Sequence, residues 1–326
     1  MKAAYRDRYG PPDIVEVRDV ERPVASGDQV VVRVAAASVN RADLDGLYPR
    51  WQFSRLFLGL RNPRRHGVGL DVAGTIESVG PNVSRFRPGD RVFGDMFSFG
   101  QSAFAEFVAA PEKAFLPIPA GMPFEQAATL PHSGVLALQG LRLRNGRTIK
   151  PGDKVLVVGA SGNVGPFVVQ IAKSIGAEVT GVSRGDKLDF VRSLGADRVI
   201  DYMKVDYTRT GERFDWIVDV DAHHGILRWR DALRPHGVYV AMGGPGSWLA
   251  QAMLVAPVAS LATGKRMGLL LWWKPFNPPD VARLESLIAR GKLKPAIDKR
   301  YPLDQVADAL RYVDAGNASG KVVITM

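Results

Sequence analysis

Short apolar runs alternate with stretches of helical periodicity through the middle of the chain. The runs are Lys154–Val158, Glu178–Val182, Arg198–Ile200, Trp216–Val220 and Val238–Met242. Such alternation predicts βα units, whose strands lie parallel in one sheet. The fold class predicted for this region is therefore α/β, with a doubly wound parallel sheet.

The first run ends in a glycine motif that opens a helix predicted over Val164–Ser174. Gly159 suits the sharp turn leaving the strand, Gly162 permits close approach of a diphosphate, and Gly165 lets the helix lie tightly on the sheet. The motif predicts a dinucleotide-binding Rossmann domain, although a tight strand-to-helix turn without a ligand has the same spacing. Its candidate cofactor-binding residues are Gly159, Ser161, Gly162, Asn163, Val164 and Gly165.

The end of the second strand indicates the choice of cofactor. An acidic side chain about 20 residues beyond the glycines would bind the ribose of NAD, but this chain has Ser183 and Arg184 there, with Lys187 nearby. A hydroxyl and two cations suit a 2′-phosphate, so we predict NADPH in preference to NADH. The alternative is that these cations are solvated loop residues, and Asp186 is close enough to pair with them.

The flanks of this region have a different pattern. Short predicted strands at Gln29–Ala36, Val72–Val79 and Arg91–Phe93 indicate a small β-rich domain, to which the apolar run Gly320–Thr325 could add a terminal strand. We therefore predict two domains, one formed by residues 1–121 and 274–326 and the other, the Rossmann domain, inserted as residues 122–273.

The composition is that of an ordinary globular protein, with 326 residues and 46% hydrophobic content. The absence of cysteine excludes disulfides and cysteine-ligated zinc. The first residues contain no apolar signal region, which predicts a cytoplasmic location. Pro257 and Gly264 interrupt the longest apolar stretch, Trp248–Trp273, so no membrane span is expected.

A net charge of +10 suits nucleic acid, a membrane surface or an anionic cofactor. The densest basic cluster, Arg61, Arg64 and Arg65, follows an aromatic segment, Trp51–Leu58, which is either a lid over a cleft or a surface excursion. No recognised nucleic-acid motif accompanies it, so no nucleic-acid partner is expected. A basic RNA-binding protein on the same fold remains an alternative.

Further motifs cover essentially the whole chain in a specific order. They are Ala37–Asp43, Gly69–Gly74, Arg87–Val92, Leu130–Gly134 and Gly291–Pro295. With them the chain resembles the medium-chain dehydrogenase/reductase superfamily, and within it the zinc-independent quinone oxidoreductase and enone reductase branch. The resemblance implies a GroES-like catalytic domain and hydride transfer from NADPH to a quinone or an α,β-unsaturated carbonyl.

The zinc ligands of this superfamily can be compared with the chain by position. Asn40 stands where zinc enzymes have a cysteine, Leu70 and Asp71 replace a His-Glu pair, and His132 lies near the last ligand position. One imidazole cannot replace the roughly three protein ligands of catalytic zinc. We therefore expect no zinc and no metal site.

The resemblance also implies the site residues. Asn40 is expected to face the nicotinamide cleft and Tyr48 to donate to the substrate oxygen, as the catalytic pair, with His132 lining the substrate cleft. Turn chemistry for Asn40 and simple packing for Tyr48 or His132 are the alternatives. Further cofactor contacts, added to Ser183, Arg184 and Lys187, are implied for Tyr202, Gly243 and Lys321, although a surface ion pair is an equal alternative for Lys321.

The run Arg266–Trp273 resembles the last strand of the nucleotide domain, which often pairs across a two-fold axis in this superfamily. A homodimer through this strand is expected, because an apolar edge otherwise invites uncontrolled pairing. Its aromatic end could instead line the cleft or touch a membrane. An NADPH-binding sensor or structural protein without turnover remains an alternative to the enzyme.

Overall fold

The computed structural model of the chain describes residues 1–48, 59–244, 246–270 and 273–326. The segment Trp51–Leu58, interpreted as a lid or surface excursion, lies outside the described residues, as do positions 271 and 272 of the expected dimer strand. The chain divides into two compact units. The first comprises Met1–Val135, Pro275–Glu285 and Pro295–Met326, and the second comprises Leu136–Lys274 and Ser286–Lys294. The domain boundaries expected after residues 121 and 273 stay predictions.

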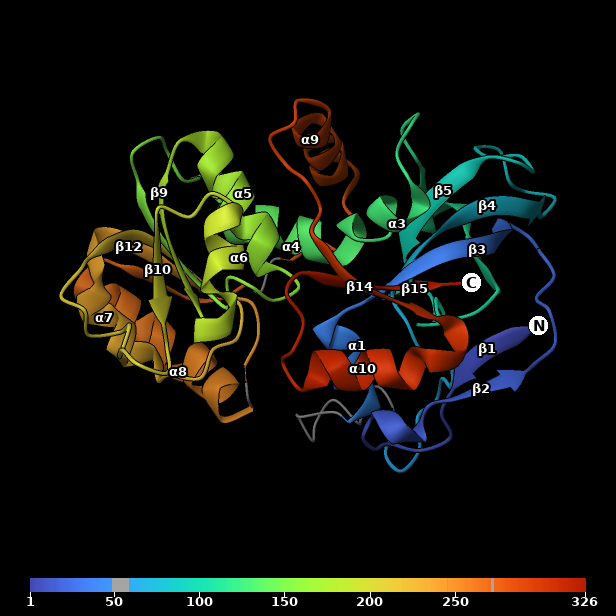
Figure 1. The fold of residues 1–326 in the computed structure, drawn as a ribbon, viewed down its shortest axis with the longest axis horizontal. Helices are drawn as coiled ribbons and strands as arrows, with labels where there is room; N and C mark the ends of the chain where they lie inside the picture. Colours follow the sequence, from blue (N-terminus) through green and yellow to red (C-terminus); the bar gives the residue numbers. More distant parts are fainter. Residues whose placement is uncertain (49–58, 245, 271–272) are drawn as a thin grey trace. The chain divides into compact units, whose positions relative to one another are not determined.

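The first unit is built on an extensive β-sheet with the strand order β14-β15-β3-β4-β5-β7, in which β6 also pairs with β3 (Figure 1). The strands are β3 (Gln29–Val39), β4 (Asp71–Val79), β5 (Arg91–Asp95), β6 (Phe107–Pro111), β7 (Phe115–Pro117), β14 (Ile297–Pro302) and β15 (Lys321–Thr325). β1 (Lys2–Tyr5) and β2 (Glu16–Asp19) form a separate antiparallel pair. The terminal strand expected from the sequence is confirmed, because β15 pairs antiparallel with β3.

Helices and short helical turns cover this sheet. They are η1 (Pro12–Ile14), α1 (Arg41–Leu47), η3 (Glu112–Ala114), α3 (Phe124–Ala127), η4 (Leu130–Gly134), η7 (Leu303–Gln305) and α10 (Val306–Asp314), while α9 (Pro278–Ala289) contributes to both units. On α10, the buried residues Val306, Ala309, Leu310 and Val313 follow the spacing of one helix face. They join the core cluster formed by the inner faces of β3, β4 and β15.

The second unit is a parallel sheet with the order β10-β9-β8-β11-β12-β13. Its strands are β8 (Lys154–Val158), β9 (Glu178–Ser183), β10 (Arg198–Asp201), β11 (Phe214–Asp219), β12 (Leu233–Ala241) and β13 (Arg266–Leu269). The chain builds outward from β8 to β10 and then returns to place β11 on the other side of β8. This is the doubly wound Rossmann arrangement, and the predicted fold class is confirmed.

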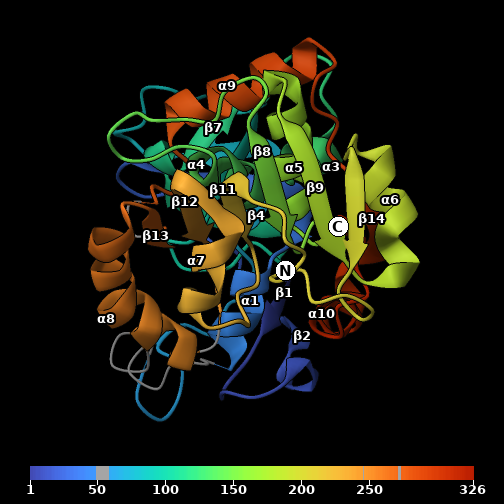
Figure 2. The ribbon, with the colours of Figure 1, turned by 90° about the vertical axis from the view of Figure 1, so that its left-hand side faces the viewer.

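Helices lie on both faces of the parallel sheet, as Figure 2 shows for α5, α6, α7 and α8. The helices and turns are α4 (Val135–Gly140), α5 (Gly165–Ile175), η5 (Gly185–Lys187), α6 (Leu188–Ser193), η6 (Ile226–Arg228), α7 (Trp229–Ala232) and α8 (Gly246–Thr263). Val191 of α6 lies against Gly181 on one face, whereas Trp229 and Trp248 join the core cluster on the other. Among the described residues, no helix has the length and apolar character needed to cross a bilayer.

Candidate active site

A buried polar cluster in the first unit surrounds Asn40, which caps the N-terminus of α1. Its Nδ2 donates to Asp71 Oδ2 at 2.9 Å, and its Oδ1 accepts from Lys321 Nζ at 2.6 Å and from Ser133 Oγ at 3.1 Å. Asn40 is only 1% exposed. Donors and acceptors on several sides therefore fix the orientation of this amide.

Lys321 and Asp71 supply the charges of the cluster. Lys321 Nζ lies 3.5 Å from Asp71 Oδ2, and both side chains are fully buried. Burial raises the pKa of Asp71, and the Lys321 ammonium opposes that rise. Burial likewise lowers the pKa of Lys321, against the attraction of Asp71. The geometry is that of a buried ion pair whose loss of hydration is partly offset by mutual attraction and by hydrogen bonds from Lys321 to Asn40 and Ser133.

His132 joins this cluster from a single π-helical turn, η4, a geometry often found at functional sites. Its backbone N–H donates to Asp71 Oδ1 at 3.1 Å, and its Nδ1 lies 3.4 Å from Asp95 Oδ2. Burial lowers the pKa of His132, but the hydrogen bond and charge of Asp95 outweigh it, so the net pKa is raised. The imidazole is thus biased toward its cationic form.

Tyr48 lies at the opposite end of α1 from Asn40, as the C-cap residue. Burial and the neighbouring Asp314 raise the pKa of Tyr48 to about 12, so the phenol keeps its proton at neutral pH. Its ring packs against the core of the first unit. The structure therefore brings Asn40, His132 and Lys321 together and places Tyr48 one helix length away.

In the second unit, the glycine motif joins β8 to α5. Gly159 has a φ of +76°, a conformation that L side chains rarely adopt. A Cβ on Gly165 would lie 2.2 Å from the carbonyl oxygen of Gly159, whereas one on Gly162 would have nothing closer than 3.6 Å. Gly165 therefore permits the close approach of helix and loop, and Gly162 leaves open backbone, as a diphosphate would require.

The other predicted cofactor residues of the second unit lie at the carboxyl ends of its strands. Ser161 Oγ and Ser183 Oγ lie 2.6 Å apart, which ties the glycine loop to the end of β9. The backbone N–H of Tyr202, just after β10, donates to the Ser183 carbonyl. Gly243 follows β12, and its carbonyl accepts from the N–H of Ala222. Parallel strands thus bring these residues to the edge where ligands of this fold bind.

The three residues predicted to bind the 2′-phosphate have different surroundings. Ser183 and Lys187 are 3% and 6% exposed, respectively. Arg184 pairs with Asp186 through two hydrogen bonds, of 2.6 and 2.8 Å. A phosphate at this position would compete with Asp186 for the guanidinium.

The chain matches two family models, an alcohol dehydrogenase GroES-like domain over residues 26–120 and a zinc-binding dehydrogenase over residues 194–324. It is 32% identical to 2-methylene-furan-3-one reductase of Solanum lycopersicum, over 99% of this chain and 79% of that protein. The chain belongs to the medium-chain dehydrogenase/reductase superfamily. This medium-chain reductase is also 30% identical to the chloroplastic NADPH-dependent alkenal/one oxidoreductase of Arabidopsis thaliana, over 99% of the chain and 79% of that protein.

Among solved structures, this medium-chain reductase is similar to the quinone oxidoreductase of Coxiella burnetii. The TM-score is 0.87 at 28% identity, with 100% of this chain and 99% of the other covered. The predicted family and its two-part fold are therefore confirmed.

The zinc named by one matching model can be tested against the side chains at hand. Asn40 stands at the position where the resemblance places a zinc ligand. In the buried cluster its Oδ1 accepts a hydrogen bond from the Lys321 ammonium group. The chain has no cysteine, and no group of three or more candidate metal ligands occurs among the described residues. The donor set of this medium-chain reductase does not fit a catalytic zinc ion.

Sequence reasoning missed several members of the cluster. Asp71 was compared only with a zinc-ligand position. Ser133, Asp95 and Ser38, whose Oγ donates to Asp71 Oδ2 at 2.9 Å, were not predicted as site residues. Ser133 follows His132 directly in a family motif, and Asp95 lies two residues beyond the strand predicted over Arg91–Phe93, so both had a weak signal in the sequence. The contact of Lys321 with Asn40 had no signal in the sequence, because it depends on the pairing of β15 with β3.

Proposed function

We propose that the protein is a zinc-independent, NADPH-dependent reductase of quinones or α,β-unsaturated carbonyl compounds. The observation that carries this proposal is the Lys321 ammonium, which is bonded to Asn40 and paired with Asp71 in the cluster where zinc relatives hold their metal. The similarity to a furanone reductase, an alkenal/one oxidoreductase and a quinone oxidoreductase supports it.

Conjugated acceptors suit a site without a Lewis acid, because delocalisation spreads the negative charge that develops on reduction. Bound NADPH supplies the hydride for this chemistry. Asn40, held by Lys321, Ser133 and Asp71, acts as a rigid positioning group. His132, whose pKa is raised by Asp95 against the effect of burial, stabilises negative charge on the acceptor oxygen. Tyr48 keeps its proposed role as a hydrogen-bond donor to the substrate.

For the cofactor we propose NADPH over NADH, held by the glycine loop and by Ser183, Arg184, Lys187, Tyr202 and Gly243. The hydrogen bond between Ser161 and Ser183 supports a shared phosphate-binding edge. On binding, Arg184 exchanges its pairing with Asp186 for the 2′-phosphate. The contact expected between Lys321 and the cofactor stays a prediction, and in the structure its ammonium lies in the buried cluster.

The deciding experiment is steady-state oxidation of NADPH, with NADH in parallel, against a quinone, linear enals and long-chain enones. We expect turnover of at least one acceptor with NADPH. In Arg184→Ala, the ratio of kcat/KM for NADPH to that for NADH should fall about tenfold. Tight NADPH binding without turnover of any acceptor would instead identify a sensor. An NADH preference would show that the cofactor assignment is wrong.

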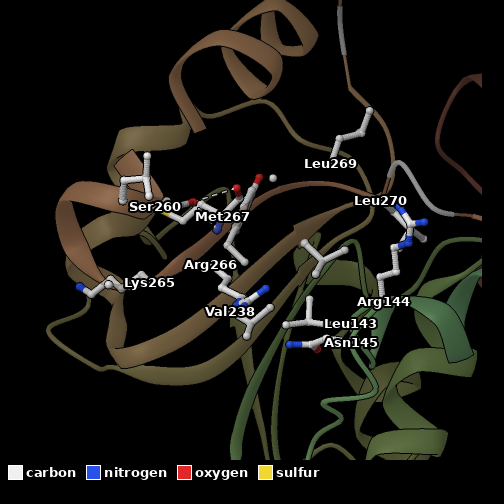
Figure 3. A pocket seen from close by; sticks show the side chains of 15 residues that line it. Leu143, Arg144, Asn145, Val238, Ser260, Lys265, Arg266, Met267, Leu269 and Leu270 are labelled. Atoms are coloured by element: carbon white, nitrogen blue, oxygen red, sulfur yellow. Dashed lines mark hydrogen bonds between the residues drawn. The ribbon is translucent and has the colours of Figure 1, made fainter. Parts of the chain in front are cut away.

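We also propose a homodimer formed through β13, which is the edge strand of the parallel sheet. A groove of about 800 Å³ runs beside it, lined among others by Leu143, Arg144, Met267 and Leu269 (Figure 3). Pairing two such edges satisfies their exposed backbone groups. The proposed location is the cytoplasm, which suits a chain without cysteine.

A further inference from the structure

Helix α8 exposes a stripe of large apolar side chains. Met253, Leu254, Val258 and Leu261 are 57%, 74%, 65% and 88% exposed. Pro257 is exposed among them. The spacing i, i+1, i+4, i+5 and i+8 places all five on one face of the helix. Apolar stripes of this kind mark a surface that binds another apolar surface.

The opposite face of α8 accounts for its packing on the sheet. Ala252, Ala256 and Ala259 are buried there, at 5%, 1% and 7% exposure. Apart from Trp248 near its start, which is buried, the helix thus turns small alanines to the core and exposes most of its larger apolar residues from Met253 onward. Packing in the core therefore does not explain why the exposed face of α8 is apolar.

Charge provides a second, independent observation. No acidic residue occurs between Asp231 and Asp280, a stretch that contains all of α8 and β13. At the C-terminal end of α8, Lys265 lies within electrostatic range of Arg213 and Arg230, with Asp231 as the carboxylate among them. Arg230 pairs with Asp231 at 3.0 Å, which leaves an excess of positive charge at this end of the helix. We call Arg213, Arg230 and Lys265 the basic cluster.

We propose that the exposed stripe of α8 and the basic cluster together bind the surface of an anionic lipid bilayer. The stripe enters the boundary between headgroups and acyl chains, and the cations contact lipid phosphates. A symmetric contact with a second copy of the chain through α8 would cover the stripe but would offer the basic cluster no carboxylate, since neither α8 nor β13 contains one. Lipid phosphates supply the opposite charge, which a second copy lacks there.

The stripe and the edge of β13 can be separated experimentally. Leu261 lines the groove beside β13, but Met253, Leu254 and Val258 do not. Changes at Leu254 and Val258 therefore test lipid binding without altering the edge at which a dimer is proposed. None of these residues belongs to the proposed active site.

The experiment is flotation of the full-length protein with vesicles of phosphatidylcholine alone or with about 30% phosphatidylglycerol, without NADPH or acceptor. We expect binding to anionic vesicles that is at least about tenfold stronger than to neutral ones and that weakens in about 0.5 M NaCl. Leu254→Glu/Val258→Glu should reduce binding about tenfold or more. Arg213→Gln/Lys265→Gln should remove the anionic preference.

The matched control is Val24→Glu/Leu60→Glu, which adds the same charges at two exposed apolar positions of the first unit and should bind as the unchanged protein does. Each variant should oxidise NADPH with a water-soluble acceptor within about twofold of the unchanged protein. Because vesicle binding needs no turnover, its outcome is independent of the proposed function. Unchanged binding by Leu254→Glu/Val258→Glu would overturn the proposal. Failure of the unchanged protein to bind anionic vesicles would also overturn it. If the Leu254→Glu/Val258→Glu variant then has a lower molecular mass in solution than the unchanged protein, a second copy of the chain covers the stripe.

Discussion

Two glycines of the same motif have different surroundings, and this difference separates folding from cofactor binding. Gly165→Ala places a methyl group 2.2 Å from a backbone oxygen that cannot move aside. We expect it to lower the free energy of unfolding by about 2–3 kcal/mol, measured by urea denaturation.

Gly162→Ala meets no atom within 3.5 Å, so its stability should change by less than about 0.5 kcal/mol. If a diphosphate lies over this backbone, the Kd for NADPH should rise about tenfold by calorimetric titration. Unchanged affinity in Gly162→Ala would contradict the assignment of the loop to the cofactor.

The buried ion pair of Lys321 and Asp71 makes a second prediction at this scale. Lys321→Met leaves a carboxylate buried without its cation and should cost about 3–5 kcal/mol of stability. Adding Asp71→Asn should recover part of that loss, because the uncompensated charge is then removed. Additive losses in the double variant, measured by urea denaturation, would show that the two groups do not depend on each other.

At single positions, the sequence identified Asn40, His132 and Lys321 but not their mutual contacts. The types of side chain and their order along the chain indicated a site. The hydrogen bonds among them depend on strands that lie far apart in the sequence and meet only in the folded sheet.

Between strands, Asp219 at the end of β11 and Tyr239 on β12 form a buried contact that makes stability depend on pH. The tyrosine hydroxyl donates to Asp219 Oδ2 at 2.8 Å, yet burial raises the pKa of Asp219 to about 7. The ordinary pKa of an aspartate is about 3.9. Between these two values the folded chain binds a proton that the unfolded chain has lost, so stability falls as the pH rises.

Asp219→Asn removes this titration. Relative to that variant, the unchanged protein should lose about 2 kcal/mol of unfolding free energy between pH 5 and pH 7. Urea denaturation at several pH values measures the difference, in which the other titrating groups cancel. A difference that does not vary with pH would mean that Asp219 is charged throughout.

Strands and helices were predicted well where their pattern is strong. The runs that became β8 and β9 and the helix α5 agree closely with the structure. β12 begins at Leu233, five residues before the predicted run, because Arg234, Pro235 and His236 interrupt its apolar pattern. The apolar stretch that begins at Trp248 contains most of α8 and all of β13. Its hydrophobicity has no clear period from which a helix and a strand could be distinguished.

For the whole molecule, the proposed dimer predicts an effect at Gly268, in the middle of β13. A Cβ at this position meets no atom within 4 Å in the chain itself. Gly268→Asp should therefore fold normally but place two carboxylates at the shared edge and give a monomer, whereas Gly268→Ala should remain a dimer. Light scattering after size-exclusion chromatography measures both masses. Equal masses for the two variants would exclude β13 as the interface.

The two-unit organisation was predicted from the change of pattern along the chain, but its detailed division was not. The contacts group residues up to Val135 with the first unit, and the boundaries expected after residues 121 and 273 stay predictions. Contacts across the chain, rather than local composition, decide such a boundary.

The pairing of β15 with β3 has a consequence for synthesis on the ribosome. β6 covers the first part of one edge of β3, and β15 covers the rest, from Ala36 to Val39. At roughly 5–20 residues per second, roughly 10 to 45 s of translation separate the emergence of β6 from that of β15. Throughout that interval the nascent chain carries an open strand edge and an Asp71 without its ammonium partner. We therefore expect the first unit to complete its sheet only after β15 has left the ribosome.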